Sequence, residues 1–593
     1  MRKIIDKGLE LSLIFLMAFL VVDVLWQVLS RYILVSPSSV TDELAGYLLI
    51  WVGLLGAAYV SGKNEHLAID LLLQHMRPSR RKLLRLFIFL IVFLFAVFVL
   101  IVGGAWLVYT RFHLGVTSAS LEINLGYVYL ALPLGGLLTA YYAIDNAITL
   151  FRSSNSYKTD DMDIIGILVL VISFFFLLVV GVPVAYSIGV AGILTMLVNI
   201  DSLPALTTYA MRMASGLDSF ALLAIPFFIL AGNIMNSGGI ALRLIDFAKV
   251  LVGRLPGGLA VVNVVANMLF GAISGSAAAA ASAIGSIMTP EMKKAGYDPN
   301  FSAAVNISSA TTGMTIPPSN VLIVYSLASG GVSVSALFMA GYLPGILTGV
   351  AIMIVAAMFA ARKGYPVGVR VPFSEATRVF FRAIPSLMLL VIVIGGILAG
   401  LFTATEASAI AVLYALILSF IYKELTWAKL PQVLLRSAKT TAIVLLLVAT
   451  CTGLSWIMSY ENIPQTVSAA LLSISDNPVV ILILINVILL IVGIFMDMTP
   501  AVLIFTPIFL PIATGQLGMD PVHFGIMMVL NLCVGLCTPP VGSVLFIGCS
   551  VAGTKIDQVI RPLLPMFAAM VIVLFLVAFL PDLSLLIPRL FGL

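Results

Sequence analysis

The sequence predicts an all-α polytopic membrane protein with an inverted internal repeat, two re-entrant hairpins and two broken helices. Of its 593 residues 61% are hydrophobic and 10% are charged, and the mean hydropathy is +1.17; this composition is typical of helical membrane proteins. A Pro-Pro pair interrupts two apolar runs, at residues 313–318 and 535–540. The two copies are 222 positions apart, and the same offset relates other Gly, Asp and Pro residues over roughly 75 residues. These observations indicate two structural halves of common design.

Composition also excludes several classes of function. We attribute the net charge of +5 to cytoplasmic lysines and arginines, so no nucleic-acid partner is predicted. The four cysteines and four histidines lack metal-ligand spacing, and the cysteines are interpreted as small buried side chains. No phosphate-binding loop or Ser/His/Asp set is present, so we predict neither an ATP-driven pump nor an enzyme, and no cofactor.

Residues 1–151 predict a small four-helix membrane domain. Its spans are expected near residues 11–33, 42–61, 86–110 and 123–151. The segment between the second and third spans is strongly basic and should be cytoplasmic, which places the N-terminus inside as well. Residues 152–163 are a polar linker, where we place the domain boundary.

Residues 164–593 predict a large domain with repeats at about 164–361 and 383–581. Its first half is expected to contain spans near 164–181, 183–200 and 219–236, a surface helix over 239–254, a hairpin over 257–290, a broken helix and a span near 337–361. Its second half is expected to contain spans near 383–402, 405–421 and 441–460, a hairpin over 478–513 and a second broken helix. The connection over 461–477 contains no lysine or arginine.

The first hairpin is predicted from its flanks. Arg254 precedes it and Lys293 and Lys294 follow it, so both ends favour the cytoplasm. Each arm is too short for an ordinary span, and the small polar tip at 274–276 must be buried against protein. The matched loop at 514–521 keeps the Gly-x-Asp-Pro motif of 292–299 but loses both lysines, so the second repeat is predicted to be inverted.

The predicted spans conflict at the linker. Counting forward from the basic segment places residue 152 inside, whereas counting backward from Lys293 places residue 164 outside. Twelve polar residues cannot cross a hydrocarbon core of about 30 Å in contact with lipid. The span count is therefore wrong by one crossing, for which residues 123–200 are the expected location.

Each hairpin tip and the following unwound segment predict a binding site made largely of backbone. Freed carbonyls and small hydroxyls are hard oxygen ligands for Na⁺, and the N-terminal ends of half-helices favour a carboxylate. The predicted sodium-binding residues are Ser274, Gly275, Ser276, Gly313, Ile316, Pro317, Asp497, Thr499, Gly535, Thr538 and Pro539. The predicted substrate-binding residues are Asn306, Thr315, Ser319, Asn320 and Thr499. For any single Ser or Thr, packing between helices is the competing interpretation.

Many short motifs of the large domain occur together in one known family. They are Gly181-Val-Pro183, Leu217-Asp-Ser-Phe220, Ile225-Pro-Phe-Phe228, Gly271-Ala-Ile-Ser-Gly-Ser276, Gly285-Ser-Ile-Met288, Pro290-Glu-Met292, Gly296-Tyr-Asp-Pro299, Pro317-Pro-Ser319, Gly400-Leu-Phe-Thr403, Thr405-Glu-Ala407 and Thr538-Pro-Pro-Val-Gly542. With them, residues 164–593 resemble the large membrane subunit of the tripartite ATP-independent periplasmic (TRAP) transporters. Residues 1–151 resemble the small subunit more weakly, through Asp42-Glu43, Glu65-His66 and the basic segment, so the two subunits look fused into one chain.

The resemblance implies an elevator-type secondary transporter in the bacterial inner membrane. A soluble periplasmic binding protein would deliver a small organic acid, and a Na⁺ gradient would drive uptake. Fused relatives include sialic acid transporters, so sialic acid is the leading substrate and C4-dicarboxylates are second. The sequence departs from the family where Ala277–Ala281 replaces a stretch that often carries an acidic residue, and where the short linker lacks a connecting helix.

Two alternatives remain beside this interpretation. One is a Na⁺/dicarboxylate symporter of related hairpin architecture that needs no binding protein. The other is a channel or membrane scaffold, which would account for the hydrophobicity but not for the inverted repeat. A neighbouring gene for a secreted carboxylate-binding protein would favour the first interpretation over the symporter.

Overall fold

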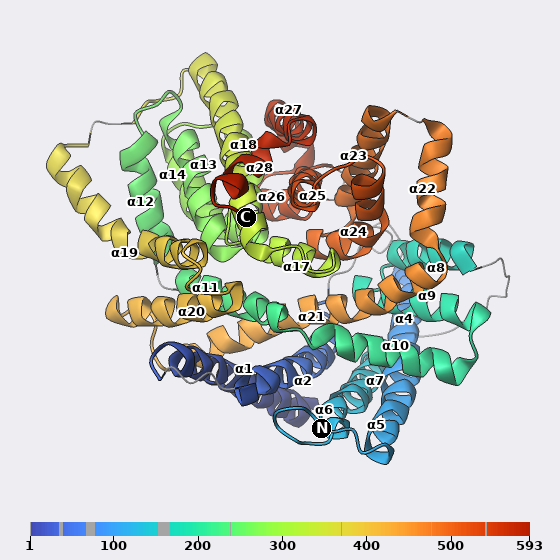
Figure 1. Cartoon of the computed structure of the whole chain (residues 1–593). Helices are drawn as coiled ribbons and strands as arrows, with labels where there is room; N and C mark the ends of the chain where they lie inside the picture. The colour runs from blue at the N-terminus through green and yellow to red at the C-terminus, as the bar shows by residue number, and fades with distance from the viewer. Residues whose placement is uncertain are drawn as a thin grey trace. The chain divides into compact units, whose positions relative to one another are not determined.

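The chain is helical throughout the part that the structure describes (Figure 1). The computed structural model describes residues 2–34, 39–66, 78–151, 166–237, 239–368, 371–475, 477–539 and 542–593. Within these ranges eleven helices are long and apolar enough to cross a membrane, and the β-structure is one isolated bridge between Thr117 and Asn124. The predicted all-α polytopic fold is confirmed. The linker predicted at 152–163 lies outside the described residues.

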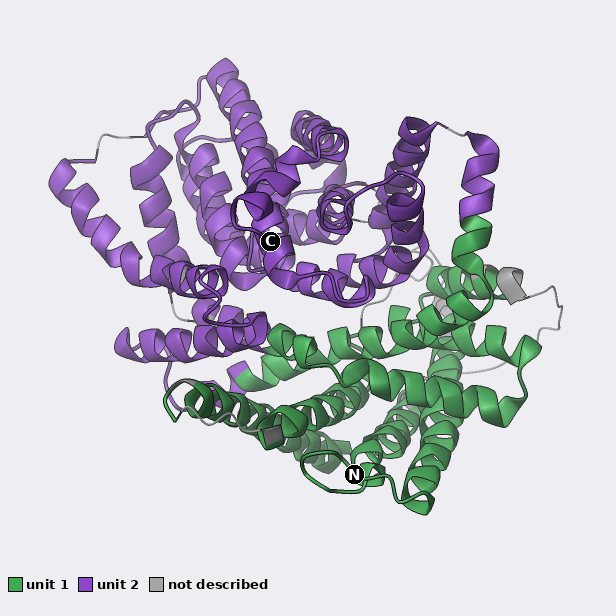
Figure 2. Cartoon of the chain, in the orientation of Figure 1, with its two compact units in different colours: residues 1–226, 434–467 green, residues 227–433, 468–593 purple. Residues whose placement is uncertain are grey.

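The contacts between helices divide the chain into two compact units (Figure 2). Unit 1 comprises residues 1–226 and 434–467, and unit 2 comprises residues 227–433 and 468–593. This division by contacts differs from the sequence boundary at 152–163, because the first helices of the large domain pack with the small one. The domain boundary that the sequence places at 152–163 therefore stays a prediction.

Unit 1 contains the four spans expected for residues 1–151. They are formed by α1 (Arg2–Tyr32), α2 (Ser39–Lys63), the continuous series α4 (Pro78–Phe95), η1 (Ala96–Gly103) and α5 (Gly104–His113), and the pair α6 (Leu125–Tyr129) and α7 (Ala131–Phe151). The middle piece η1 is a π-helix. Helix α2 packs against α1 and α7 and is mostly buried, so it is the central element of this bundle.

The same unit contains a helix that the sequence analysis missed. After α8 (Gly166–Val180) and α9 (Val184–Asn199), α10 (Ser202–Leu217) runs through a stretch with Pro204 and many small polar residues, which hid its helical pattern. Its Tyr209 hydroxyl donates a hydrogen bond of 2.8 Å to the Thr450 carbonyl of α21 (Leu430–Tyr460). Together with residues 220–236, α10 forms a pair bent by 60°. The span expected near 219–236 is thus the second half of a longer, bent element.

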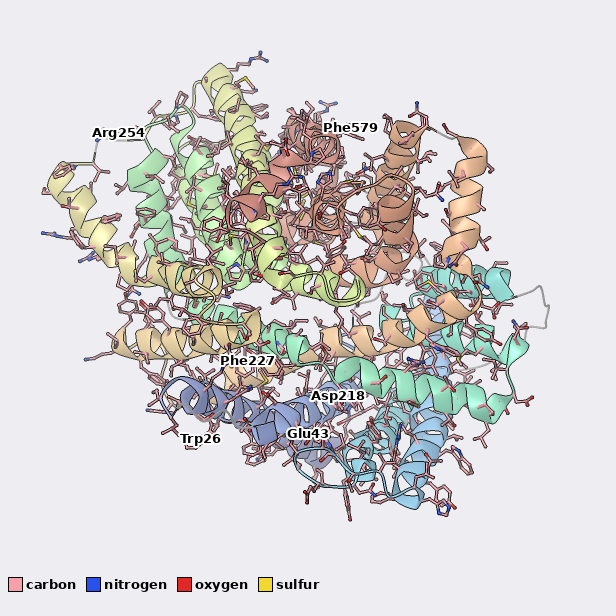
Figure 3. All side chains as sticks on the ribbon, viewed as in Figure 1. Trp26, Glu43, Asp218, Phe227, Arg254 and Phe579 are labelled. Atoms are coloured by element: carbon pink, nitrogen blue, oxygen red, sulfur yellow. The ribbon has the colours of Figure 1, made fainter. Side chains whose placement is uncertain are left out.

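A carboxylate in unit 1 holds the loop between α5 and α6. Glu43, near the start of α2, accepts hydrogen bonds from the backbone N–H groups of Ala119, Ser120 and Leu121 at 2.9, 2.8 and 2.8 Å. Asp218, at the bend after α10, lies against the same helix, since a Cβ on Gly46 would be 2.9 Å from its carboxylate oxygen (Figure 3). Asp218 therefore lies beside the first turns of α2, the helix that carries Glu43.

Unit 2 contains both hairpins and both broken helices. Its first half comprises most of α11 (Ala224–Ser237), then α12 (Ile240–Val252), α13 (Gly258–Ser274), α14 (Ala277–Lys294), α15 (Pro299–Ala310), α16 (Thr312–Thr315), α17 (Asn320–Ala328) and α18 (Val334–Lys363). The helices α19 (Phe373–Leu398) and α20 (Ala404–Ile421) follow. Its second half comprises α23 (Pro478–Phe495), α24 (Met498–Gly515), α25 (Pro521–Leu536), α26 (Ser543–Ala552), α27 (Ile556–Phe579) and α28 (Asp582–Leu590). A further unexpected helix, α22 (Ile463–Ile474), occupies the connection that was expected over 461–477.

The Gly-x-Asp-Pro motif explains why the two halves share a loop. Gly296 and Gly518 have φ of +84° and +62°, a conformation that glycine adopts without strain. Asp298 and Asp520 then cap the next helix, each accepting a hydrogen bond from the N–H two residues on, at 2.9 and 2.8 Å. The proline that follows occupies the first turn, where its missing N–H costs nothing. The motif therefore ends one helix and starts another at the same place in both halves.

Helices of the two halves contact each other reciprocally. Helix α14 packs on α26, and its counterpart α24 packs on α17, the counterpart of α26. In the same way α15 packs on α27 and α25 packs on α18. Contacts that exchange partners in this way are the mark of a two-fold axis relating two similar bodies. This arrangement is the one that the predicted inverted repeat requires.

Candidate functional site

The first hairpin turns tightly around one glycine. Helix α13 ends at Ser274, Gly275 has φ of +59°, and the Ser276 hydroxyl caps α14 by accepting a hydrogen bond of 3.2 Å from the Ala279 N–H. A Cβ on Gly275 would lie 3.0 Å from the Asn320 side-chain nitrogen. The predicted tip therefore contacts the first residue of α17, after the first break.

The arm of this hairpin approaches the break through two glycines. A Cβ on Gly271 would lie 2.6 Å from the Gly313 Cα, so the two backbones are in direct contact. The Ala277 N–H also donates a hydrogen bond of 3.1 Å to the Met314 sulfur. The structure thus brings the predicted residues of the first tip together with those of the first break.

The break itself is an extended segment between α16 and α17. Ile316 has ψ of 123°, outside the helical region, and Pro317 and Pro318 follow it. Two glycines of α18 make room for this segment, because a Cβ on Gly341 would collide with the Thr315 carbonyl oxygen and one on Gly345 with the Ile316 side chain. The predicted broken helix is confirmed here.

The second hairpin repeats this design. Helix α23 ends at Phe495, Asp497 precedes α24, and a Cβ on Gly493 would lie 3.0 Å from the Gly535 Cα. Gly493 and Gly535 are the 222-residue counterparts of Gly271 and Gly313. Thr538 lies just beyond the end of α25, and its hydroxyl donates a hydrogen bond of 2.9 Å to the Val534 carbonyl.

For two other predicted residues of the second site, the structure gives a position in the chain and no contact with the break. Thr499 lies in the first turn of α24, and Pro539 directly follows Thr538. Pro540, the second proline of the pair, lies outside the described residues. The assignment of these residues to Na⁺ stays a prediction.

Polar atoms without a protein partner gather at the first break. Within the described ranges, Ser319 Oγ and Asn320 Oδ1 are buried and have no hydrogen-bond partner. Ser319 is fully buried. An unsatisfied buried polar atom costs about 1–3 kcal/mol, so such atoms are the places where a bound ion or substrate group would be stabilised.

Asn306 is placed differently from the other predicted substrate residues. Its Nδ2 donates to the Ala281 carbonyl at 2.8 Å, and its Oδ1 accepts from Asn267 at 3.1 Å. Asn267 also donates to Asn263 and Ser309, both at 2.8 Å. Asn306 therefore joins α15 to both arms of the first hairpin, and a contact with substrate stays a prediction.

Sequence reasoning missed the asparagines of the hairpin arms. Asn263 and Asn267 are four residues apart on α13, on one helical face within an apolar run, and that spacing could have revealed them. The second hairpin has its own pair, since Asn531 donates to the Asn486 carbonyl and side chain, both at 2.9 Å. Asn267 and Asn486 therefore each hold the first arm of a hairpin against the helix that precedes its break.

The chemistry of this site fits an alkali cation and an organic anion better than a transition metal. Within the described residues no group of three His, Cys, Asp or Glu side chains could hold a metal ion. The donors near the breaks are hydroxyls, amides and backbone groups, which are hard ligands. All four cysteines are buried and unpaired, as the sequence suggested.

Comparison with known proteins gives matches over nearly the whole chain. Residues 171–583 match the family described as "Tripartite ATP-independent periplasmic transporter, DctM component", and residues 20–153 match its DctQ component. An isethionate TRAP transporter permease protein DctMQ of Oleidesulfovibrio alaskensis is 35% identical over 96% of this chain and 92% of its own length.

Two further relatives bracket that level of identity. A sialic acid TRAP transporter permease protein SiaT of Haemophilus influenzae is 30% identical over 95% of this chain and 96% of its own length. An uncharacterized protein, YgiK, of Salmonella typhimurium is 56% identical over 72% of this chain and 98% of its own length.

Proposed function

Because this chain belongs to the tripartite ATP-independent periplasmic transporters, with the DctQ and DctM components fused, we propose that it couples Na⁺ entry to the import of a small organic acid. It is a multi-pass transport protein of the bacterial inner membrane, not an enzyme. Permeases of this family work with a periplasmic substrate-binding protein, and that protein is the proposed donor here.

The observation that carries the proposal is the contact between each hairpin and its broken helix. In both halves a glycine pair brings backbone to backbone, beside an unwound segment. At the first break the unpartnered Ser319 Oγ and Asn320 Oδ1 supply oxygen atoms that a Na⁺ ion would coordinate. Two such places support a stoichiometry of at least two Na⁺ per substrate, with net positive charge entering the cell when the substrate carries one negative charge.

The proposed mechanism is an elevator. Both tips and both breaks belong to one compact unit, unit 2, which is what an elevator requires of the body that carries the substrate. The small N-terminal domain belongs to unit 1, with α8–α10 and most of α21. That composition suits a scaffold.

The names of the relatives support an acid as substrate but diverge on which one. One relative is named for isethionate, a sulfonate, and another for sialic acid, a carboxylate. Both acids are small and carry one negative charge. We keep sialic acid as the first candidate, add isethionate, and retain C4-dicarboxylates behind them.

Reconstitution tests the proposal directly. In proteoliposomes containing this chain, uptake should need both the cognate soluble binding protein and an inward Na⁺ gradient, and an inside-negative potential should accelerate it. An entering charge gains about 2.3 kcal/mol per 100 mV, so the effect should be large. Strong Na⁺-driven uptake without any soluble protein would favour the binding-protein-independent symporter instead.

A pair of serine variants tests the ion site. Ser319→Ala should raise the Na⁺ concentration for half-maximal uptake by about 5- to 150-fold, the equivalent of roughly 1–3 kcal/mol. Ser308→Ala is the control, because Ser308 is equally buried but its hydroxyl already bonds the Ala304 carbonyl at 2.9 Å. Equal Na⁺ activation in the two variants would remove Ser319 from the site while leaving Na⁺ coupling itself open to the reconstitution test.

A further inference from the structure

A pocket of unit 2 with charged side chains in its lining takes no part in the proposed transport site. Its volume is about 550 Å³, and it lies between α12, the first turns of α19 and the end of α20. Its lining includes Arg243, Asp246, Phe381, Arg382 and Tyr422. The two arginines and the aspartate give it charges of both signs.

The residues around this pocket are those expected at the level of the lipid headgroups, on the side of the membrane that the basic segment predicts to be cytoplasmic. Helix α19 carries Arg378 and Arg382 in its first turns and becomes apolar from Ala383 onward. Two exposed aromatic side chains belong to the same part of the chain, since Phe381 of the pocket is 68% exposed and Trp427, in the segment after α20, is 76% exposed. Basic residues together with exposed aromatic residues are typical of a membrane interface.

The first arginine is held in place but keeps a free donor. The Arg243 guanidinium lies 3.4 Å from the centre of the Tyr422 ring, and one of its nitrogens lies 3.3 Å from a Glu424 carboxylate oxygen. Its other terminal nitrogen, Nη1, is buried without a hydrogen-bond partner in the described part of the chain. Arg382 adds a second guanidinium to the same pocket. Two guanidinium groups that line one pocket suit a phosphate.

The carboxylate in the pocket is weakly compensated by protein. Asp246 lies 3.9 Å from Lys249, but that lysine lies 2.8 Å from Glu291 and is shared with it. The Asp246 side chain is 59% exposed, which leaves room for a ligand cation. The pocket thus combines a place for a phosphate with a place for an ammonium group.

We propose that this pocket binds a membrane phospholipid with an ethanolamine headgroup. The phosphodiester lies between Arg243 and Arg382, the primary ammonium faces Asp246, and an acyl chain covers Phe381. A lipid whose headgroup has no cation would leave Asp246 beside a phosphate with only the shared Lys249 and Arg382 as cationic neighbours. This inference is independent of the proposed Na⁺ coupling.

Competition for the purified full-length protein tests the proposal. The protein in detergent is mixed with equal amounts of dioleoyl phosphatidylethanolamine and dioleoyl phosphatidylglycerol, and the retained lipids are counted by native mass spectrometry. We expect several-fold preference for phosphatidylethanolamine. Arg382→Gln should lower its retention about tenfold, as expected for a charge-assisted contact. Arg362→Gln, an exposed arginine at the end of α18, should have no effect.

Two further arms separate the parts of the headgroup. Asp246→Asn should reduce the preference between the two lipids to near one while leaving phosphate binding in place. Free phosphoethanolamine at the same concentration should not displace the lipid, because it lacks the acyl chain. Equal losses in the two arginine variants, an unchanged preference in Asp246→Asn, or full displacement by phosphoethanolamine would each overturn the assignment.

Discussion

Replacing Gly271 by alanine tests the contact between the first hairpin and the first break. The new Cβ would lie 2.6 Å from the Gly313 Cα, whereas ordinary van der Waals contact begins at 3.4 Å, so the two backbones must separate by the difference, about 0.8 Å. Neither atom belongs to a flexible side chain that could move away. Overpacking of this kind costs about 1–3 kcal/mol. Alanine in a helix offsets about 1 kcal/mol of that cost relative to glycine.

Gly395→Ala is the matched control for this variant. Gly395 is also helical, but a Cβ there would meet nothing within 4 Å, so only the helix-propensity gain remains. The free energy of unfolding in detergent should therefore differ between the two variants by about 1–3 kcal/mol, with Gly271→Ala the less stable. Gly493→Ala, whose Cβ would lie 3.0 Å from the Gly535 Cα, should fall between them.

Transport should separate the same variants. Gly271→Ala moves the tip away from the break and should raise the Na⁺ concentration for half-maximal uptake, measured in proteoliposomes with the binding protein. Gly395→Ala should leave it unchanged. If the two variants were equally stable and had the same Na⁺ activation, the close packing of hairpin and break would have no role in either property.

Three other perturbations test separate features. Single cysteines at Lys294 and Gln516 in a cysteine-free background should react with an impermeant maleimide from opposite sides of the membrane; reaction from one side would reject the inverted repeat. Asn267→Ala should lower the free energy of unfolding by about 1–3 kcal/mol in denaturant titration, because it removes a donor to the buried Asn306 side-chain oxygen. An equal loss in Asn199→Ala, at an exposed asparagine, would contradict this reason. Glu43→Gln replaces one acceptor oxygen by a donor, so hydrogen exchange of the three amides that it binds should accelerate several-fold; unchanged protection would show that other contacts hold the loop.

The features that sequence could predict were those with a strong local signal. The Pro-Pro pairs and the Gly-x-Asp-Pro loops recur at a fixed offset and revealed the repeat, and the basic residues on both flanks revealed the first hairpin. Helix α10 escaped because Pro204 and its small polar residues resemble a connection, and its burial depends on contacts distant in sequence, such as that of Tyr209 with α21.

The candidate site shows the same limit. Sequence singled out Ser319 and Asn320 beside the prolines, but their lack of partners depends on packing and appears only in the structure. The structure also gives Asn306 two partners that its position in the sequence does not indicate. Local chemistry is readable from sequence, whereas the satisfaction of each polar atom depends on the assembled helices.

The reciprocal packing of the two halves has a consequence for how the protein is made. Helix α14 leaves the ribosome long before its partner α26, which begins at Ser543, 249 residues after Lys294. At the usual synthesis rate of about 5–20 residues per second, that interval is roughly 12–50 s. Throughout this time, lipid or the insertion machinery contacts the surface of α14 that will later pack against α26. The packing of unit 2 can therefore be completed only after the last fifth of the chain, which contains α23–α28, has been synthesised.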